Sequence, residues 1–352
     1  MKQAVDRPIR IGMHTYTLHF FGFGESWGFG KDYFFDQVMS LYELMDKCVE
    51  WELDGLQITK VDLLTTAQDD PFSTENLHKV AAYAKKCGLF LEFNSSFNAG
   101  SDSRVNCTVE EALRIGHDLD AELVKFSLDI IRPKNLFGSE MHPDVVKQML
   151  VRYDEFKAAI PLIEEYGMQI AIENHTDTKA DEIVWLVDKL NHTLIGTCVD
   201  NMNAYYVTDD PEQAYEKMLP SAYCCHFSDD LIYTDPLGVH IVGAAHGQGS
   251  MDCKRMIDMI REKSPMDKII MENVVPEGYE PFAETLKEMH KLAKILRKSK
   301  EDRGYIDFDL DEVKIIQDEQ GRAIDVQKRI RGEGEKLIED FMIAANECVA
   351  SH

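Results

Sequence analysis

The sequence predicts a (β/α)8 barrel, or TIM barrel, of the α/β class with an appended C-terminal segment. Eight short apolar runs alternate with eight longer amphipathic stretches over about 290 residues. The apolar runs are continuous rather than strictly alternating, which is typical of parallel strands covered on both faces. An open doubly wound sheet is the alternative, but no Gly-x-Gly-x-x-Gly motif follows the first run.

The expected strands are short runs rich in Ile, Val, Leu, Phe or Cys. They span residues 9–15, 55–58, 89–94, 123–128, 169–173, 196–200, 223–227 and 268–272. The expected helices span residues 32–51, 74–87, 108–118, 143–166, 179–190, 210–219, 252–263 and 280–298. In these stretches apolar residues recur every three or four positions. Gly88 and Gly167 directly follow two of them and are expected to end those helices.

The rhythm of strands and helices stops near residue 300. We therefore expect two domains, a barrel over residues 1–300 and a non-catalytic tail over residues 301–352. The first part of the tail, residues 301–331, is polar with little helical period. Residues 333–350 have the apolar face of an amphipathic helix.

The composition restricts the classes of partner. The chain has 38 Lys and Arg against 63 Asp and Glu, a net charge of −25. So acidic a protein repels phosphates, and no basic stripe offsets this, so we expect neither nucleic acid nor a membrane as a partner. The N-terminus lacks the apolar segment of a signal peptide, and the eight cysteines form no Cys-x-x-Cys pair. These features predict a cytoplasmic protein with reduced thiols.

Metal-binding residue types stand at the ends of the last four expected strands. These residues are Glu173, Asp200, His226 and Glu272, separated by 27, 26 and 46 residues. Catalytic groups of such barrels stand at the carboxyl ends of the strands, around one mouth. Three carboxylates and one imidazole suit Mn²⁺ or Mg²⁺ better than a metal that prefers thiolates. Each residue alone could be a solvated loop residue, but four in register predict a divalent metal site.

These motifs resemble the xylose isomerase-like sugar phosphate isomerase/epimerase barrels. The resemblance rests on Glu-Asn-His after strand five, Val-Asp-x-x-Asn after strand six, His in strand seven, Met-Glu-Asn after strand eight and the loop 246–252. It implies a divalent ion, commonly Mn²⁺, on Glu173, Asp200, His226 and Glu272. It also implies proton transfer beside a sugar carbonyl by carboxylates or a histidine.

Two departures disfavour a plain ketose epimerase. Many epimerases of this family carry His where this chain has Asn203, and a second Glu where it has Lys179. The passages 11–17, 124–127 and 173–178 are closer to the catalytic subunits of bacterial C-glycoside deglycosidases. That similarity implies a metal-dependent lyase acting on a keto-glycoside oxidised at sugar C3, release of an aromatic aglycone, and a small β-sandwich partner subunit. We also expect an oligomer.

Two other function classes stay open. One is a keto-sugar isomerase, epimerase or inosose-type dehydratase with the same metal site, and the other is a non-catalytic barrel. The catalytic candidates are His175, Glu173 and Glu272, with a structural role for His175 as the alternative. The substrate-binding candidates are His14, Trp27, Lys125, Asn203 and His246. For Lys125 a lysine reaching the barrel rim is the alternative, and for His246 a surface histidine.

The tail resembles a different family, the RNB-type exoribonucleases such as ribonuclease R. The similar stretches are residues 302–309 and 335–347. The aspartate cluster that this family uses for its catalytic metals has no counterpart here. With 7 basic and 14 acidic residues the tail offers no path for RNA, so we expect no nuclease activity.

Overall fold

The computed structural model describes residues 8–25, 35–100, 102–133, 139–236, 238–273, 283–304, 313–317, 323–328, 340–344, 346, 347 and 349. The chain divides into two compact units, Met1–Gly278 and Tyr279–His352. The first contains the barrel and the second the tail. The predicted boundary at residue 300 falls inside a helix of the second unit, α10 (Ala283–Asp302).

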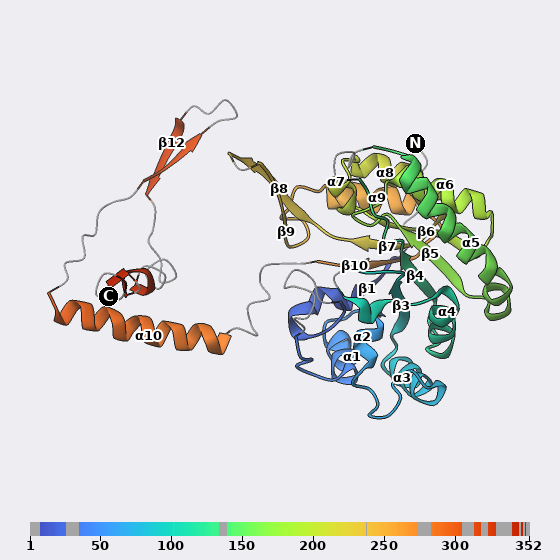
Figure 1. Cartoon of the computed structure of the whole chain (residues 1–352), viewed down its shortest axis with the longest axis horizontal. Helices are drawn as coiled ribbons and strands as arrows, with labels where there is room; N and C mark the ends of the chain where they lie inside the picture. The colour runs from blue at the N-terminus through green and yellow to red at the C-terminus, as the bar shows by residue number, and fades with distance from the viewer. Residues whose placement is uncertain are drawn as a thin grey trace. The chain divides into compact units, whose positions relative to one another are not determined.

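Within the described residues, eight parallel strands close into a barrel with helices outside it, which confirms the predicted fold (Figure 1). Around the barrel the strand order is β1-β10-β7-β6-β5-β4-β3-β2. The bounds are β1 Arg10–His14, β2 Gly55–Ile58, β3 Phe90–Ser96, β4 Leu123–Ser127, β5 Gln169–Glu173, β6 Ile195–Asp200, β7 Ala222–Phe227 and β10 Lys268–Met271. All strands run in one direction, so their carboxyl ends share one mouth.

The helices follow the predicted segments closely. Their bounds are α1 Leu41–Glu50, α3 Thr74–Cys87, α4 Val109–Asp118, α5 Pro143–Tyr166, α6 Ala180–Leu190, α8 Pro211–Met218 and α9 Cys253–Lys263. Short helices add α2 Lys60–Leu63 and α7 Asn203–Tyr206, and 3-10 turns span Thr15–Phe21, Ser103–Val105 and Leu219–Ser221. The first predicted helix is too long, because Ser40 caps α1: its side chain accepts from the Glu43 N–H, and the Glu43 carboxylate accepts from the Ser40 N–H.

The loop after β7 contains a hairpin that was not predicted. Strand β8 (Asp230–Asp235) pairs antiparallel with β9 (Gly238–Gly243), and the pair projects from the barrel (Figure 1). Its base is fixed by Asp229, whose carboxylate accepts from the N–H groups of Gly247, Gly249 and Met251 at 2.8 to 3.1 Å. The hairpin therefore leaves the barrel from a rigid support beside the mouth.

Glycines make room for an aromatic side chain inside the barrel. A Cβ atom on Gly55 would lie 2.4 Å from the ring of Phe90, and one on Gly12 would lie 2.8 Å from the same ring. Larger residues at these positions would clash with a side chain in close packing. Most of the remaining apolar core lies between the strands and the outer helices, as expected for this architecture.

The tail unit contains two strands that were not predicted. Strands β11 (Val313–Gln317) and β12 (Ala323–Lys328) form an antiparallel pair within residues 301–331, the polar stretch with little helical period. The carboxylate of Asp340 is buried and accepts hydrogen bonds from Arg297 at 2.8 Å and Lys300 at 2.9 Å. These bonds fasten the segment around residue 340 to α10. Most of the predicted helix 333–350 lies outside the described residues.

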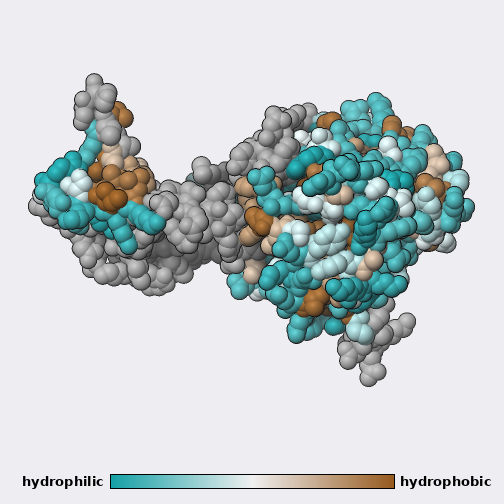
Figure 2. Space-filling view, turned by 90° about the horizontal axis from the view of Figure 1, so that it is seen from below, coloured by the Kyte–Doolittle hydropathy of each residue, from teal (hydrophilic) through white to brown (hydrophobic). Residues whose placement is uncertain are grey.

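The exterior fits the acidic composition. The face of the barrel drawn in Figure 2 is mostly hydrophilic, with scattered hydrophobic residues. Among the described helices, none combines the length and the apolar character that crossing a bilayer requires. The seven described cysteines form no disulfide with one another.

Candidate metal centre

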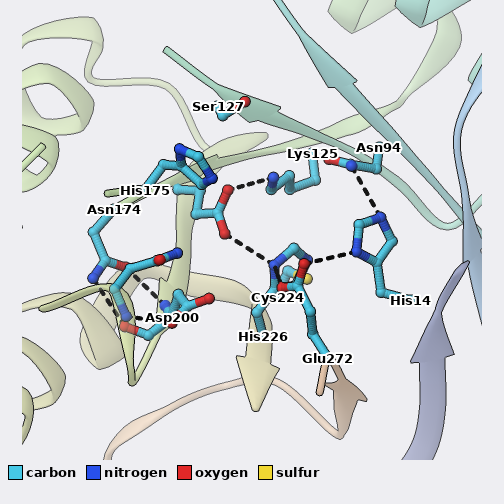
Figure 3. Close-up of polar contacts among 12 residues, drawn as sticks. His14, Asn94, Lys125, Ser127, Asn174, His175, Asp200, Cys224, His226 and Glu272 are labelled. Carbon is cyan, nitrogen blue, oxygen red and sulfur yellow. Dashed lines mark hydrogen bonds and ion pairs between the residues drawn. The ribbon is translucent and has the colours of Figure 1, made fainter. Parts of the chain in front are cut away.

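The structure brings the four predicted ligands together at the mouth of the barrel (Figure 3). One ligand atom from each of Glu173, Asp200, His226 and Glu272 lies within 4.8 Å of the others. The strand register explains this, because Asp200 is paired with His226 across β6 and β7, and Ile270, two residues before Glu272, is also paired with His226. Side chains at equivalent heights on adjacent strands then point to one centre.

The polar atoms of this centre face one another without satisfying one another. Nδ1 of His226 lies 2.9 Å from Oε1 of Glu173 and 2.5 Å from Oε2 of Glu272. Among the described residues, Nδ1 of His226 is nonetheless buried without a hydrogen bond of good geometry. Buried polar atoms are rarely left in this state. Oxygen and nitrogen donors that converge on one point fit a divalent cation.

The charged groups of the centre also favour a bound cation. Burial and the neighbouring carboxylates of Glu173 and Glu272 raise the pKa of Asp200 to about 8. Burial disfavours a charged His226, but the carboxylates of Glu272 and Glu173 outweigh this and raise its pKa well above the ordinary value. Three carboxylates, two of them buried and that of Glu272 partly buried, thus draw positive charge to the centre, and a bound divalent ion would provide it.

Asp200 is oriented by the backbone that follows it. Its Oδ1 accepts hydrogen bonds from the N–H groups of Met202 and Asn203, both at 2.8 Å. Asn174 also bridges to the Asp200 backbone, with its side chain accepting at 2.7 Å and donating at 2.9 Å. One carboxylate oxygen is therefore held in place, and the other is left for the centre. Asn203, a predicted substrate contact, begins α7 and helps to fix this ligand through its backbone.

His14 and Lys125 support the two glutamates. His14 is buried, with Nδ1 2.9 Å from Oε1 of Glu272 and Nε2 3.0 Å from the amide nitrogen of Asn94. The amide donates to Nε2, so Nδ1–H of His14 donates to Glu272. Lys125 is buried and forms an ion pair with Oε2 of Glu173. The alternative of a lysine reaching the rim is therefore wrong, because the charge of Glu173 holds its ammonium group inside the barrel.

His175 lies at the mouth, next to the centre (Figure 3). Its side chain is one-third exposed, and Nδ1 is 3.8 Å from Oδ1 of Asp177. Burial opposes its protonation, but the carboxylates of Glu173 and Asp177 outweigh this and raise its pKa. It is thus a partly accessible imidazole beside the ligands. The structure assigns it to no metal-binding cluster among the described residues.

The remaining predicted contacts are less directly placed. His246 is tied to the protein at both ring nitrogens, with Nε2 2.9 Å from the carbonyl oxygen of Phe227 and Nδ1 3.4 Å from the side-chain amide nitrogen of Asn273. Its ring stacks on Phe227 with 5.6 Å between centroids. His246 therefore holds the loop after the hairpin against β7. The other predicted contact, Trp27, lies outside the described residues.

Sequence analysis missed three polar residues close to the centre. Gln57 contacts His226, with 2.7 Å between Oε1 and Nε2, and Asn94 contacts His14. Glu25 lies in the loop between β1 and α1, and burial raises its pKa to about 7 despite the opposing charges of His175 and Lys125. Gln57 and Asn94 stand near the carboxyl ends of β2 and β3. Extending the strand-end rule to the first half of the barrel would have found both.

Comparisons with known proteins separate the two parts of the chain. The family model described as "Xylose isomerase-like TIM barrel" matches residues 45–295. The model described as "RNB domain" matches residues 249–352, so the second match starts before the predicted tail and overlaps the first.

Solved structures with the barrel fold are distant in sequence. The IOLI protein with a bound zinc atom has 15% identity and a TM-score of 0.56, covering 77% of this chain and 91% of that one. A xylose isomerase-like TIM barrel protein from Mycobacterium smegmatis in complex with magnesium has 17% identity and a TM-score of 0.53, covering 78% and 92%. The 3-keto-D-glucoside 4-epimerase YcjR from E. coli has 12% identity and a TM-score of 0.50, covering 76% and 92%. At these identities the matches establish the fold.

The curated relatives are ribonuclease R proteins, which match only a short part of the chain. Ribonuclease R of Thermotoga maritima is 52% identical over 73 residues, which is 20% of this chain and 10% of that protein. Ribonuclease R 1 of Lactococcus lactis is 47% identical over 76 residues, or 22% and 9%. The chain therefore spans about a tenth of the length of these relatives. The predicted resemblance to a ribonuclease R fragment is confirmed.

Proposed function

The chain belongs to the xylose isomerase-like TIM barrel family, and on that premise we propose that it is a divalent-metal-dependent lyase acting on 3-oxo-glucosides. The product is a released aromatic aglycone. The observation that carries the proposal is the convergence of Glu173, Asp200, His226 and Glu272 on one point, where Nδ1 of His226 lies within 2.9 Å of two carboxylates. The residues fit Mn²⁺, with Mg²⁺ or another divalent ion as the alternative. Distant proteins of this fold are described with zinc and with magnesium.

A divalent ion held by these four residues would act as a Lewis acid toward the substrate carbonyl. The side chains around it set the charge and position of the ligands. Lys125 balances the charge of Glu173, and His14, held by Asn94, donates to Glu272. Both glutamates are thereby kept as carboxylates in fixed orientations. This support favours a preorganised site rather than a pair of free carboxylates flanking a glycosidic bond.

The proton transfers are assigned to His175. A 3-oxo group acidifies the hydrogen on sugar C2, and His175 removes that hydrogen as a proton. The bond between C1 and the aglycone then breaks, and its electron pair leaves with the aglycone, which takes up a proton. A C1–C2 double bond remains in the 3-oxo sugar. Substrate loses only the protonated aglycone, so no oxidant or reductant is needed.

The second candidate is a keto-sugar isomerase, epimerase or inosose-type dehydratase at the same centre. It is favoured by the placement of Glu173 and Glu272 on either side of Nδ1 of His226, since a proton could pass through either glutamate. It is disfavoured at Lys179, where family epimerases carry a second Glu. Here Nζ of Lys179 is paired with Asp209 at 3.0 Å, so this side chain provides no carboxylate for an epimerase mechanism.

One assay separates the two candidates. Purified protein loaded with Mn²⁺ is incubated with aromatic 3-oxo-glucosides and, separately, with free ketoses, and products are separated by chromatography. The proposal expects free aglycone from the first substrates and no epimer from the second. Epimer without aglycone would establish the second candidate, and neither product with a metal-loaded protein would contradict both.

We propose that the tail adds no ribonuclease activity and is dispensable for the barrel's chemistry. Its net charge is negative, and it corresponds to about a tenth of ribonuclease R. Truncation after Lys300 should leave turnover within about twofold, since the four predicted ligands lie before residue 279. Lost turnover in a folded truncated barrel, or degradation of single-stranded RNA by the full chain, would contradict this. The small β-sandwich partner and the oligomer stay predictions, to be checked by light scattering on the purified protein.

A further inference from the structure

A second group of polar residues lies inside the barrel, next to the metal centre. We use the term interior chain for a row of contacting side chains, those of Gln57 of β2, Glu92 of β3 and Lys268 of β10. Their side chains are buried, with Gln57 and Glu92 fully inaccessible and Lys268 5% exposed. Gln57 and Glu92 face each other across β2 and β3. None of the three is needed to hold a cation, so their burial calls for another explanation.

The interior chain makes continuous contact from the centre into the barrel. Nε2 of His226 lies 2.7 Å from Oε1 of Gln57, and Nε2 of Gln57 donates to Oε2 of Glu92 at 2.8 Å. Nζ of Lys268 lies 2.8 Å from the other oxygen of Glu92. The Sγ–H group of Cys224 also donates to Glu92, at 3.4 Å. Every group that contacts Glu92 is thus a donor or a cation.

The direction of each hydrogen bond follows from these partners. A carboxylate paired with an ammonium group can only accept, so the amide nitrogen of Gln57 has to face Glu92. The carbonyl oxygen of Gln57 then faces His226 and can only accept. Nε2 of His226 therefore carries a hydrogen in both the neutral and the charged ring. The nitrogen left for a cation is Nδ1, the atom that lies between Glu173 and Glu272.

We propose that Gln57, oriented by the pair of Glu92 and Lys268, is the positioning residue that keeps Nδ1 of His226 available for a divalent cation. The inference rests on the proposed metal centre and adds the residues that determine how its histidine binds. Partners in the outer shell of a metal site fix the tautomer and orientation of ligating histidines, and their loss typically costs about 10–100-fold in metal affinity. In this barrel an amide transmits the orientation from a buried ion pair to the histidine.

The ion pair is itself anchored at the far end of the interior chain. Lys268 also lies 2.6 Å from Glu122, whose carboxylate accepts from Arg10 at 2.7 and 2.9 Å. Burial opposes a charged Lys268, but the carboxylates of Glu92 and Glu122 outweigh it and raise its pKa. Glu92 consequently keeps a cationic partner and stays an acceptor, so the side-chain amide of Gln57 keeps its orientation.

The experiment exchanges hydrogen-bond donors and acceptors at positions 57 and 92 while it keeps the size and shape of the side chains. In Glu92→Gln the new amide can donate as well as accept, so Gln57 is free to turn its nitrogen toward His226. Mn²⁺ affinity, measured by calorimetry on the full chain, should fall about 10–100-fold. In the double variant Gln57→Glu with Glu92→Gln, an oxygen that can only accept faces His226 again, now from a carboxylate, and Lys268 keeps Glu122. Its affinity should return to within about fivefold of the parent.

A matched control and a spectroscopic readout complete the test. Glu75→Gln makes the same Glu-to-Gln exchange at an exposed ion pair with Lys79, and should bind Mn²⁺ within about twofold of the parent. In the diamagnetic Mg²⁺-loaded protein, ¹⁵N spectra of histidine should show a slowly exchanging Nε2–H of His226, which Glu92→Gln weakens or abolishes. Parent-like affinity and spectra in a folded Glu92→Gln protein would overturn the proposal, as would a double variant no better than the single one.

These outcomes separate this inference from the proposed function. A parent protein that binds Mn²⁺ but releases no aglycone would contradict the lyase and leave the role of Gln57 standing. Parent-like Mn²⁺ binding in Glu92→Gln would contradict the role of Gln57 and leave the lyase standing. A parent protein that binds no divalent ion at all would overturn both.

Discussion

The metal centre and the interior chain are both groups of polar residues inside the barrel, but they differ in the charges that they bring together. In the interior chain, the Gln57 amide and the Lys268 ammonium face groups of opposite character. At the centre, three carboxylates converge on one imidazole, and Nδ1 of His226 lies 2.9 Å from Glu173 and 2.5 Å from Glu272. Because neighbouring carboxylates repel one another unless a cation balances them, we expect the interior chain to stabilise the barrel and the metal centre to bind a ligand.

The largest expected effect comes from removing a ligand at the centre. In Glu272→Gln a neutral amide replaces a carboxylate that lies 2.5 Å from His226. Mn²⁺ affinity should fall by more than about 100-fold, beyond the loss typical of outer partners, and turnover should fall with it. Calorimetry and the aglycone assay measure the two losses. Unchanged metal binding would place the cation elsewhere.

The next effect separates proton transfer from metal binding at the same mouth. His175→Ala should lower kcat on 3-oxo-glucosides by about 10²–10⁴-fold, the usual contribution of a positioned acid or base. Mn²⁺ content should stay at the parent level, because His175 belongs to no metal-binding cluster of the described residues. Normal turnover would pass the role to Glu173 or Glu272 and favour the epimerase. Lost metal would make His175 a ligand or its support.

The third effect addresses the stability supplied by the interior chain. Lys268→Met leaves Glu92 buried without its cationic partner, and breaking such a pair typically costs about 3–5 kcal/mol. Urea unfolding followed by circular dichroism measures the free energy of unfolding. The control is Lys254→Met, which removes an exposed pair with Asp258 and should leave the unfolding midpoint in place. Equal effects in the two variants would show that the interior chain does not stabilise the fold.

The smallest effect is a dependence of stability on acid. Burial opposes ionisation of Glu122, but Arg10 and Lys268 outweigh it and lower its pKa from 4.5 to about 2. Because the folded pKa is depressed, this stabilisation is present above about pH 4.5 and is lost as the pH falls toward 2. It should amount to less than about 1 kcal/mol, since the side chain is 36% exposed. Glu122→Gln should therefore flatten acid unfolding between these pH values, and identical acid curves would contradict it.

The barrel could be predicted from the sequence because its strands are continuous apolar runs and its helices have clear ends, as at Gly88 and Gly167. The rule that catalytic groups stand at the carboxyl ends of the strands also predicted the four ligand candidates. The interior chain was not predicted, because Glu92 is one acidic residue in an apolar run and its cation is 176 positions away in the sequence. Pairings of that kind depend on the closure of the barrel.

The hairpin of β8 and β9 is a different kind of omission. Two apolar stretches, residues 231–234 and 239–242, flank a Pro-Leu-Gly turn, which is a hairpin signal that could have been recognised. Its two strands pair antiparallel and lie outside the barrel sheet, so the alternation of barrel strands and helices does not predict them. The position of Lys125 also could not be predicted, since only the three-dimensional placement of Glu173 holds that ammonium group inside the barrel.

Anomalous scattering at the manganese edge, from crystals grown with Mn²⁺, would locate the bound ion directly, and elemental analysis of the same protein would count it. We expect one ion per chain, bound by Glu173, Asp200, Nδ1 of His226 and Glu272, with Nε2 of His226 still directed at Gln57. A well-ordered structure in which these four side chains point apart, or in which the ion binds elsewhere, would contradict it.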